Sequence, residues 1–353
     1  MLPLSQRIKA FEQLGKFLSH FSFDWHKDSN YPQDKKYTEL NEAIRKTIAS
    51  NPWFTEVSIM DALSGIVELL NPQFFSKWVN SYKTNTTNQR RVGVVMAGNI
   101  PMVGFHDFMC VLMSGHSFLG KLSSDDPWLL PVLANEIVKT DIDFSDIILF
   151  TTEKLRGFDA IIATGSDNSA RYFDYYFGKY PNIIRSNRNS LAILNGSENI
   201  DDFRKLAVDI FSYFGLGCRS VSNVLLPSGY DPTKLFEGFM QFEGLKNQHK
   251  YFNNYEYNKA ILLVNGEKHY DNGFVILKEE EQLSSPVAVL HYQFYQNNAH
   301  LSTIIESHTS KIQCIVSKDA FWPHSVNFGE AQRPHIHDYA DNIDTMDFLL
   351  NLE

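Results

Sequence analysis

Between residues 91 and 178, short apolar runs typical of strands alternate with segments typical of helices, and this alternation constrains the fold most. The strand-type runs are RVGVVMA, SFLGKLS, DIILF and DAIIAT, at 91–97, 117–123, 146–150 and 159–164. The predicted helices lie at 102–115, 127–139 and 168–178. Strands that alternate with helices form parallel βαβ units, with helices on both faces of the sheet. The sequence therefore predicts an α/β fold with a doubly wound parallel sheet, which binds ligands beyond the carboxyl ends of its strands.

The rest of the chain predicts a helical N-terminal region, a second α/β lobe and a tail. Asn-Pro pairs in SNPWF and LLNPQFF end helices within about the first 85 residues. A helix is predicted over 200–214, and strand-type runs lie at 190–194, 222–227, 286–292 and 311–317. We expect a first domain over 1–193 and a second over 194–325. The tail, 326–353, is expected to return to the first domain or to contact a partner subunit.

Length and composition exclude several classes of protein. A chain of 353 residues is long enough for two domains, and its net charge of −9 argues against a nucleic-acid-binding protein. Three widely spaced cysteines do not resemble a disulfide framework. The N-terminus lacks a signal-peptide core, and no apolar run has the length of a transmembrane segment. We therefore expect a soluble cytoplasmic protein.

Two polar residues follow the first two strand-type runs. Asn99 comes directly after a strand and a glycine, and Pro101 suits the first turn of a helix. The Asn99 amide can donate a hydrogen bond to a developing oxyanion, although asparagine also simply suits a turn. Lys121 ends the next run, where it can reach a ribose or a phosphate or extend along the surface into solvent.

A small polar turn follows a later strand-type run. Thr164, Gly165 and Ser166 stand between the run 159–164 and a predicted helix. The backbone N–H groups at such a helix start attract an anion or a polar cofactor group. The glycines here do not form the G-x-G-x-x-G fingerprint, so this motif alone identifies no cofactor.

One cysteine lies in a glycine turn. In YFGLGCRSVS, Cys218 follows Gly215 and Gly217, whereas Cys110 and Cys314 lie inside apolar runs and are expected in the core. Taken alone, the turn fits a working thiol or a small residue at a tight corner.

The order of these features resembles that of the aldehyde dehydrogenase superfamily, and more closely the acyl-CoA reductases of the bacterial luminescence (LuxC) type. The resemblance covers about residues 90–345 and rests on GVVMAGNIP, GKLSS, ATGS and FGLGCRS. It implies that Asn99 belongs to an oxyanion hole and that Lys121 contacts the cofactor ribose. It places the ATGS turn beside the nicotinamide or the pyrophosphate, and it makes Cys218 the nucleophile. The first domain would then bind the cofactor and the second would carry catalysis.

The chain departs from the hydrolytic members of that superfamily before the cysteine. Those enzymes carry a general-base glutamate about thirty residues before the nucleophile. Here no glutamate or aspartate stands between Asp174 and Glu198. Without a base to activate water, an acyl-cysteine resists hydrolysis and persists until it is reduced or transferred.

A second departure concerns the choice of cofactor. Relatives that prefer NAD carry a carboxylate three residues after the lysine, where this chain has Ser124. The change leaves room for a 2′-phosphate and favours NADPH, although Asp125 and Asp126 next to it keep NADH as an alternative. Gln282 falls near the place of the glutamate that grips the nicotinamide ribose, with Glu281 beside it, and that contact stays unassigned.

The resemblance implies NADPH-dependent reduction of a long-chain fatty acyl-CoA to the aldehyde through an S-acyl-cysteine. The acyl donor is acyl-CoA or acyl carrier protein, and the partner would be an acyl-protein synthetase or a second copy of the chain. The alternative is an acyltransferase or acyl-binding subunit that keeps cysteine acylation without productive hydride transfer.

Other polar residues receive structural interpretations. His335 and His337 form an H-x-H pair without further ligands at metal spacing, so no metal site is expected. His106 and Asp107 either face the cofactor or form a buried pair, and the second is favoured. Arg219, next to the cysteine, is expected to be structural or on the surface.

Overall fold

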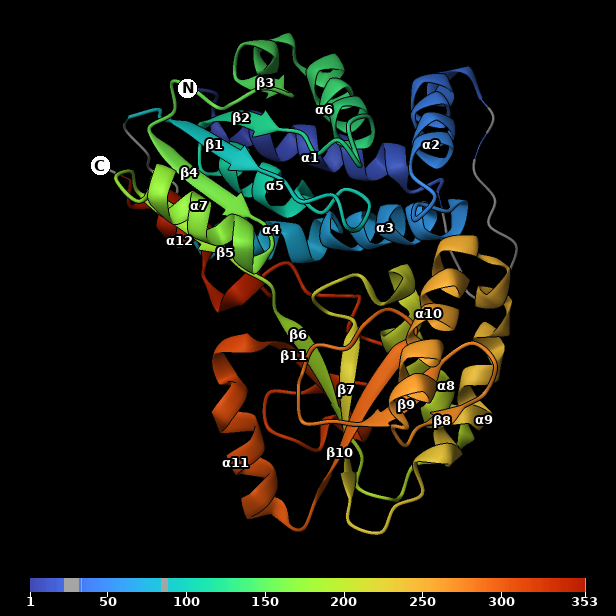
Figure 1. Ribbon diagram of the computed structural model, residues 1–353. Coiled ribbons are helices and arrows are strands. Elements are labelled where there is room, and N and C mark those ends of the chain that lie inside the picture. The colour runs from blue at the N-terminus through green and yellow to red at the C-terminus, as the bar shows by residue number, and fades with distance from the viewer. Residues whose placement is uncertain (22–31, 33, 84–87, 353) are drawn as a thin grey trace. The chain divides into compact units, whose positions relative to one another are not determined.

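The computed structural model describes residues 1–21, 32, 34–83 and 88–352, and it divides into two compact units (Figure 1). The first unit comprises Met1–Asn187 and His335–Glu353, and the second comprises Arg188–Pro334. The sequence placed the end of the first domain at residue 193, six residues after the observed end at Asn187. The difference arises because the strand at 189–193 pairs with strands of the second unit. The tail likewise returns to the first unit from His335 and not from residue 326, since residues 326–327 pair with the second sheet.

The first unit contains a five-stranded sheet in the order β3-β2-β1-β4-β5. Its strands are β1 (Arg91–Val95), β2 (Ser117–Lys121), β3 (Ile148–Thr151), β4 (Ala160–Thr164) and β5 (Asn182–Arg185). All four strand pairings are parallel, which confirms the doubly wound sheet. Strand β5 was not predicted, because it is only four residues long and only Ile183 and Ile184 in it are apolar.

Helices cover both faces of this sheet. The α-helices in the described part of this unit are α1 (Leu4–Leu18), α2 (Thr38–Ser50), α3 (Glu56–Leu69), α4 (Pro72–Asn80), α5 (Phe105–Met113), α6 (Leu129–Thr140), α7 (Asp167–Phe177) and α12 (Thr345–Leu350). Helix α5 is buried along nearly its whole length and joins α1, α6 and α12 in one hydrophobic core, while α7 lies on the other face (Figure 1). Pro101 was wrongly predicted to lie in the first turn of α5, because residues 99–104 form a turn in which Met102 has a φ of 55°.

The second unit contains a seven-stranded sheet in the order β12-β11-β6-β7-β10-β9-β8. Its strands are β6 (Asn189–Ile193), β7 (Val221–Pro227), β8 (Tyr270–Asp271), β9 (Ile276–Glu279), β10 (Val289–Tyr295), β11 (Ile312–Ser317) and β12 (Val326–Asn327). Only the β8–β9 pairing is antiparallel. Its α-helices are α8 (Ile200–Phe211), α9 (Leu235–Phe239), α10 (His249–Asn265) and α11 (Asn298–His308).

Alternating side chains of the second sheet enter separate cores on its two faces. Ala192 and Leu194 contribute to the core that contains α8 and α9 residues, whereas Leu191 and Ile193 contribute to the core beneath α11. Each face of a strand in a parallel sheet is apolar because helices cover both sides. This explains why SLAIL reads as a continuous apolar run.

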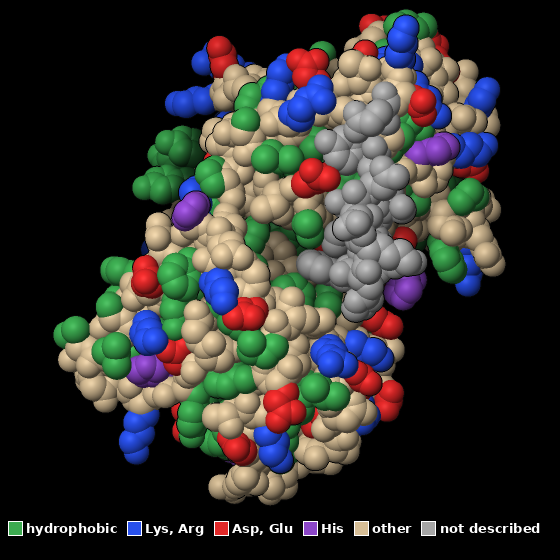
Figure 2. Space-filling model, turned by 90° about the vertical axis from the view of Figure 1, so that its right-hand side faces the viewer, with side chains coloured by type: hydrophobic (Ala, Val, Ile, Leu, Met, Phe, Trp, Pro, Cys, Tyr) green, Lys and Arg blue, Asp and Glu red, His purple; other side chains and the backbone are tan. Residues whose placement is uncertain are grey.

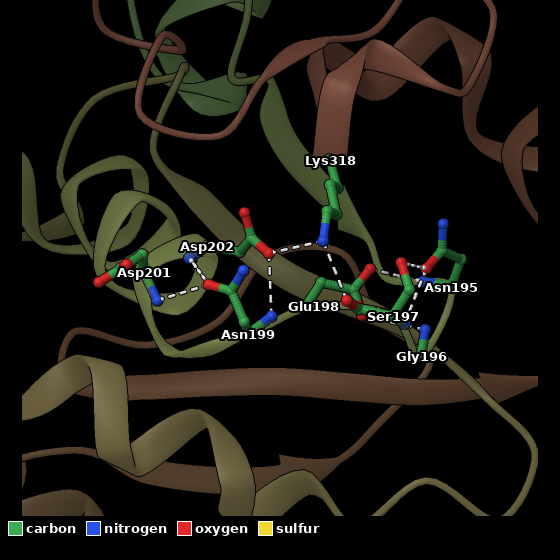
Figure 3. A network of polar contacts seen from close by, with 8 residues as sticks. All are labelled: Asn195, Gly196, Ser197, Glu198, Asn199, Asp201, Asp202 and Lys318. Carbon is green, nitrogen blue, oxygen red and sulfur yellow. Dashed lines mark hydrogen bonds and ion pairs between the residues drawn. The ribbon is translucent and has the colours of Figure 1, made fainter.

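A polar network ties the carboxyl end of β11 to the start of α8 (Figure 3). Asn199 caps α8 by accepting from the N–H groups of Asp201 and Asp202. Lys318, which follows β11, forms an ion pair of 2.9 Å with Asp202 and donates to the backbone oxygen of Ser197. These contacts fix the helix start at the carboxyl edge of the second sheet.

The surface carries charges of both signs. On the face shown in Figure 2, basic and acidic side chains are interspersed. Within the described ranges, none of the helices combines the length and the apolar character needed to cross a membrane.

Candidate active site

Three of the predicted site segments lie at one edge of the first sheet. Strands β1, β2 and β4 run parallel, and the register pairs Val95 with Lys121 and with Ala163. The loop that carries Asn99, the side chain of Lys121 and the ATGS turn therefore all follow the carboxyl ends of neighbouring strands. Ligands of doubly wound sheets bind at this edge.

The loop that carries Asn99 packs tightly against the loop that follows β2. Asn99 is exposed. The N–H of Met102 donates to Oδ2 of Asp126 at 2.7 Å. A Cβ at Gly98 would come within 2.8 Å of the Cβ of Ser123, so only glycine fits there. The two loops therefore hold each other in place, and burial raises the pKa of the Asp126 carboxyl to about 6.

The proposed ribose and phosphate contacts have distinct surroundings. Lys121 is half-buried and its Nζ lies 3.5 Å from the backbone oxygen of Thr152. Ser124 is exposed in the turn that follows. A cofactor ribose bound near Lys121 would therefore meet the hydroxyl of Ser124, with the exposed carboxylate of Asp125 next to it in sequence.

The ATGS turn joins β4 to α7 in a close fit. The N–H of Gly165 donates to the backbone oxygen of Arg185, and Ser166 caps α7 by accepting from the N–H of Ser169 at 3.3 Å. A Cβ on Gly165 would stand 2.7 Å from the Cβ of Ser169 and 2.9 Å from the ring of Phe173. The absence of a side chain brings the backbone close to the start of α7, where unsatisfied N–H groups favour an anion.

Asp107 is buried and His106 is half-buried, and each side chain bonds to a residue outside α5. Asp107 forms a buried ion pair with Arg185 at 2.6 Å, and Arg185 also donates to Oγ1 of Thr345 at 2.9 Å. Nε2 of His106 lies 2.9 Å from the backbone oxygen of Ile336. Both residues thus attach the returning tail to α5.

In the second unit, Cys218 is exposed in a turn between α8 and β7. Three consecutive residues before it, Tyr213, Phe214 and Gly215, have φ angles of 53°, 60° and 76°. Positive φ is unfavourable for residues other than glycine, and such strained backbone tends to occur at functional sites. Oγ of the buried Ser190 donates to the backbone oxygen of Cys218 at 3.0 Å, which fixes the peptide that follows the thiol.

The other two cysteines are buried, as predicted. Burial raises the pKa of the Cys110 thiol, which keeps it protonated and poorly nucleophilic. Of the three cysteines, only Cys218 is thus accessible to a substrate.

One segment distant in sequence, residues 331–332, supports the turn around Cys218 through two hydrogen bonds. Nη1 of Arg219 donates to the backbone oxygen of Ala331 at 3.4 Å, and Nε2 of Gln332 donates to Oγ of Ser220 at 3.2 Å. Arg219 is therefore half-buried and makes a structural contact. Ser190 and Gln332 were not among the predicted residues, because nothing local in the sequence distinguishes them from other polar residues.

The loop that contains Gln282 lies against the strand that follows the cysteine. Oγ of Ser222 donates to the backbone oxygen of Leu283 at 2.7 Å, and Nδ2 of Asn223 donates to that of Gln282 at 3.1 Å. The Gln282 side chain is exposed. The structure thus attaches this loop to the beginning of β7.

Glu198 is the first acidic residue after Asp174 in the sequence. It lies at the opposite end of the second sheet from Cys218 and so cannot act on it. It follows the carboxyl end of β6, whereas Cys218 precedes the amino end of the parallel strand β7. A seven-residue strand is about 20 Å long at ~3.3 Å per residue. The Glu198 carboxylate instead accepts the N–H groups of Asn195 and Gly196 (Figure 3).

No cluster of three or more His, Cys, Asp or Glu side chains is placed to hold a metal ion among the residues that the structure describes. His335 and His337 stack on each other with ring centres 5.7 Å apart. Both are exposed, so the pair is a surface feature.

Comparison with solved structures identifies the fold. The indole-3-acetaldehyde dehydrogenase AldA of P. syringae, solved with NAD+ and IAA, is 12% identical with a TM-score of 0.63, covering 94% of this chain and 75% of that one. Aldehyde dehydrogenase 21 of Physcomitrella patens, in complex with the reaction product succinate, is 14% identical with a TM-score of 0.65, covering 99% and 85%. An NADP-dependent enzyme of E. coli is 11% identical with a TM-score of 0.64, covering 94% and 76%.

Comparison with protein families gives a more specific result. No curated protein matches the chain. The family model for the acyl-CoA reductase LuxC matches residues 6–237, which is well over half of the chain and includes every predicted site residue. The chain is therefore an oxidoreductase that belongs to the LuxC acyl-CoA reductase family and has the aldehyde dehydrogenase fold.

Proposed function

We propose that this protein reduces a long-chain fatty acyl-CoA to the aldehyde through an S-acyl intermediate on Cys218. The observation that carries the proposal is the exposed thiol in a strained turn, in a chain of this family whose other two cysteines are buried. Acyl carrier protein is the alternative acyl donor. The first unit would bind the cofactor and the second would carry the nucleophile.

The covalent step is acyl transfer to sulfur. The Cys218 thiolate attacks the thioester carbonyl, and the new oxyanion accepts hydrogen bonds from the Asn99 amide and the backbone N–H of Cys218. The carbon–sulfur bond to CoA then breaks, and the CoA thiolate leaves and takes up a proton. Since Glu198 follows the far end of the sheet, it cannot activate water against the acyl-cysteine.

The nicotinamide cofactor would bind at the carboxyl edge of the first sheet. Lys121 would contact its ribose, and the close packing of Gly165 against Ser169 and Phe173 holds the backbone at the start of α7, where an anionic group can bind. When bound, the cofactor would supply the hydride that converts the thioester into a thiohemiacetal. The role of Cys218 is then to leave as a thiolate while the thiohemiacetal oxygen becomes the aldehyde carbonyl.

We infer a preference for NADPH over NADH. Thr164 and Ser166 would flank the nicotinamide or the pyrophosphate, whereas the exposed Ser124 leaves space for a 2′-phosphate where a carboxylate would repel it. Solved neighbours include complexes with NAD+ and an NADP-dependent enzyme, so the fold accommodates both.

Mass spectrometry of the intact protein tests this function directly. The protein is incubated with acyl-CoA esters of increasing chain length, with and without NADPH. We expect a mass increase of one acyl group without NADPH, and its loss with release of aldehyde when NADPH is added. Acylation that NADPH and NADH both leave in place would instead indicate an acyltransferase or acyl-binding subunit. The absence of acylation with every ester would exclude both functions.

A further inference from the structure

The segment 328–332, FGEAQ, packs into the second unit beside α8. Phe328 and Ala331 are buried in the same core as α8 residues, and Gly329 between them has a φ of 87°. The segment follows the short edge strand β12. Its own secondary structure is irregular, so contacts with the rest of the unit must hold it.

A single carboxylate holds this segment from the helix side. Asp209, near the end of α8, has no exposed surface. Its Oδ2 accepts the N–H of Gly329 at 2.7 Å and its Oδ1 accepts the N–H of Ala331 at 3.0 Å. A carboxylate in an apolar core is costly unless it is satisfied, so a buried aspartate with two backbone donors is a specific clamp.

The opposite side of the same segment reaches the residues next to Cys218. The backbone N–H of Ala331 donates to Asp209, and the backbone oxygen of Ala331 accepts from Nη1 of Arg219. This one residue therefore links the clamp to the nucleophile turn. Gln332 adds a second link through Ser220. The turn also contains the strained run 213–215.

We propose that Asp209 is a positioning residue for Cys218, which acts by clamping the segment 328–332 against the nucleophile turn. The inference rests on the proposed function insofar as Cys218 is the nucleophile. The clamp fixes the backbone N–H of Cys218, which must point at the oxyanion, and the direction of the thiol. An asparagine cannot replace the aspartate, because its amide nitrogen would face one of the two backbone donors.

The test compares Asp209→Asn with Asp202→Asn. Asp202 lies on the same helix but in the network at the carboxyl edge of the sheet (Figure 3), so its loss weakens the same helix away from the turn. We expect Asp209→Asn to slow single-turnover acylation at saturating acyl-CoA by about tenfold to a hundredfold. Asp202→Asn should stay within about twofold of the wild type, because its site is distant from the turn.

A second readout needs no substrate. Amide hydrogen exchange over residues 213–222 should accelerate in Asp209→Asn and not in Asp202→Asn, because only the first loses the clamp. Gln332→Ala, which removes a half-buried side chain, should show a smaller acceleration of exchange over the same residues. If Asp209→Asn does not fold, this variant tests whether the segment 328–332 orders the nucleophile turn.

Unchanged exchange and unchanged acylation in both Asp209→Asn and Gln332→Ala would overturn the inference, as would equal effects of Asp209→Asn and Asp202→Asn. Failure of the wild type to accept any acyl group would exclude the proposed function instead. The exchange measurement would still decide whether Asp209 orders the turn.

Discussion

Cys218 differs from the other two cysteines in exposure, and this difference predicts the result of replacing each. Cys218→Ala should abolish acyl transfer from acyl-CoA, because no thiolate remains to form the thioester. Cys110→Ala should retain acylation, since its sulfur is buried against His106. Intact-protein mass spectrometry after incubation with acyl-CoA measures both. Acyl loading of Cys218→Ala would contradict the assignment of the nucleophile.

Ser124 controls cofactor choice in the proposed function. Ser124→Glu places a carboxylate where a 2′-phosphate would lie, so we expect NADPH affinity to fall by about tenfold or more. NADH affinity should hold or rise, because a carboxylate can accept hydrogen bonds from a ribose diol. Titration of each nucleotide followed by fluorescence quenching checks this. Equal losses for both nucleotides would indicate that the exposed loop of Ser124 does not contact the ribose.

At the scale of an element, the junction of β4 and α7 depends on a missing side chain. Gly165→Ala would force a Cβ to within 2.7 Å of Ser169, so the turn must shift. We expect a loss of about 1–3 kcal/mol in the free energy of unfolding, together with weaker NADPH binding. Thermal denaturation and nucleotide titration measure the two effects.

Gly244→Ala is the matched control for that substitution. A Cβ at Gly244 would meet no atom within 4 Å, and its φ is not positive. It should change neither stability nor nucleotide binding appreciably. A Gly165→Ala protein that behaves like this control would show that the turn has more room than the structure indicates.

At the scale of the whole molecule, two buried aspartates make stability depend on pH. Burial raises the pKa of Asp209 from 3.8 to about 7 and that of Asp126 to about 6. Between pH 4 and these values the native state binds more protons than the unfolded chain. The free energy of unfolding contributed by these groups therefore falls as pH rises from about 4 to about 7.

The difference between the wild type and Asp209→Asn isolates this contribution. Burial lowers the pKa of His116 and of His291, which affects stability in the opposite sense near pH 6. Those groups are present in both proteins and cancel in the comparison. The midpoint of thermal unfolding of the wild type should fall relative to the variant between pH 5 and pH 7. Parallel pH profiles would contradict the shifted pKa of Asp209.

The local pattern of the chain was sufficient for four of the five strands of the first sheet and for the choice of the candidate residues. Each of the strands β1 to β4 is an apolar run next to a turn signal, so its position to within about two residues is visible in sequence. The order of Asn99, Lys121, ATGS and Cys218 also carried the family resemblance, which the family model over residues 6–237 confirms. These features are local, since each depends on a few consecutive residues.

Only the tertiary structure decided which strands share a sheet and what supports the cysteine. The strand at 189–193 looks like one more strand of the first domain, but hydrogen bonds to β7 and β11 place it in the second unit. Asp209 reads as one acidic residue on a helix, although it binds backbone groups 120 and 122 positions later. Contacts over such separations leave no periodicity in the sequence, because they depend on how packed elements meet and not on the residues beside them.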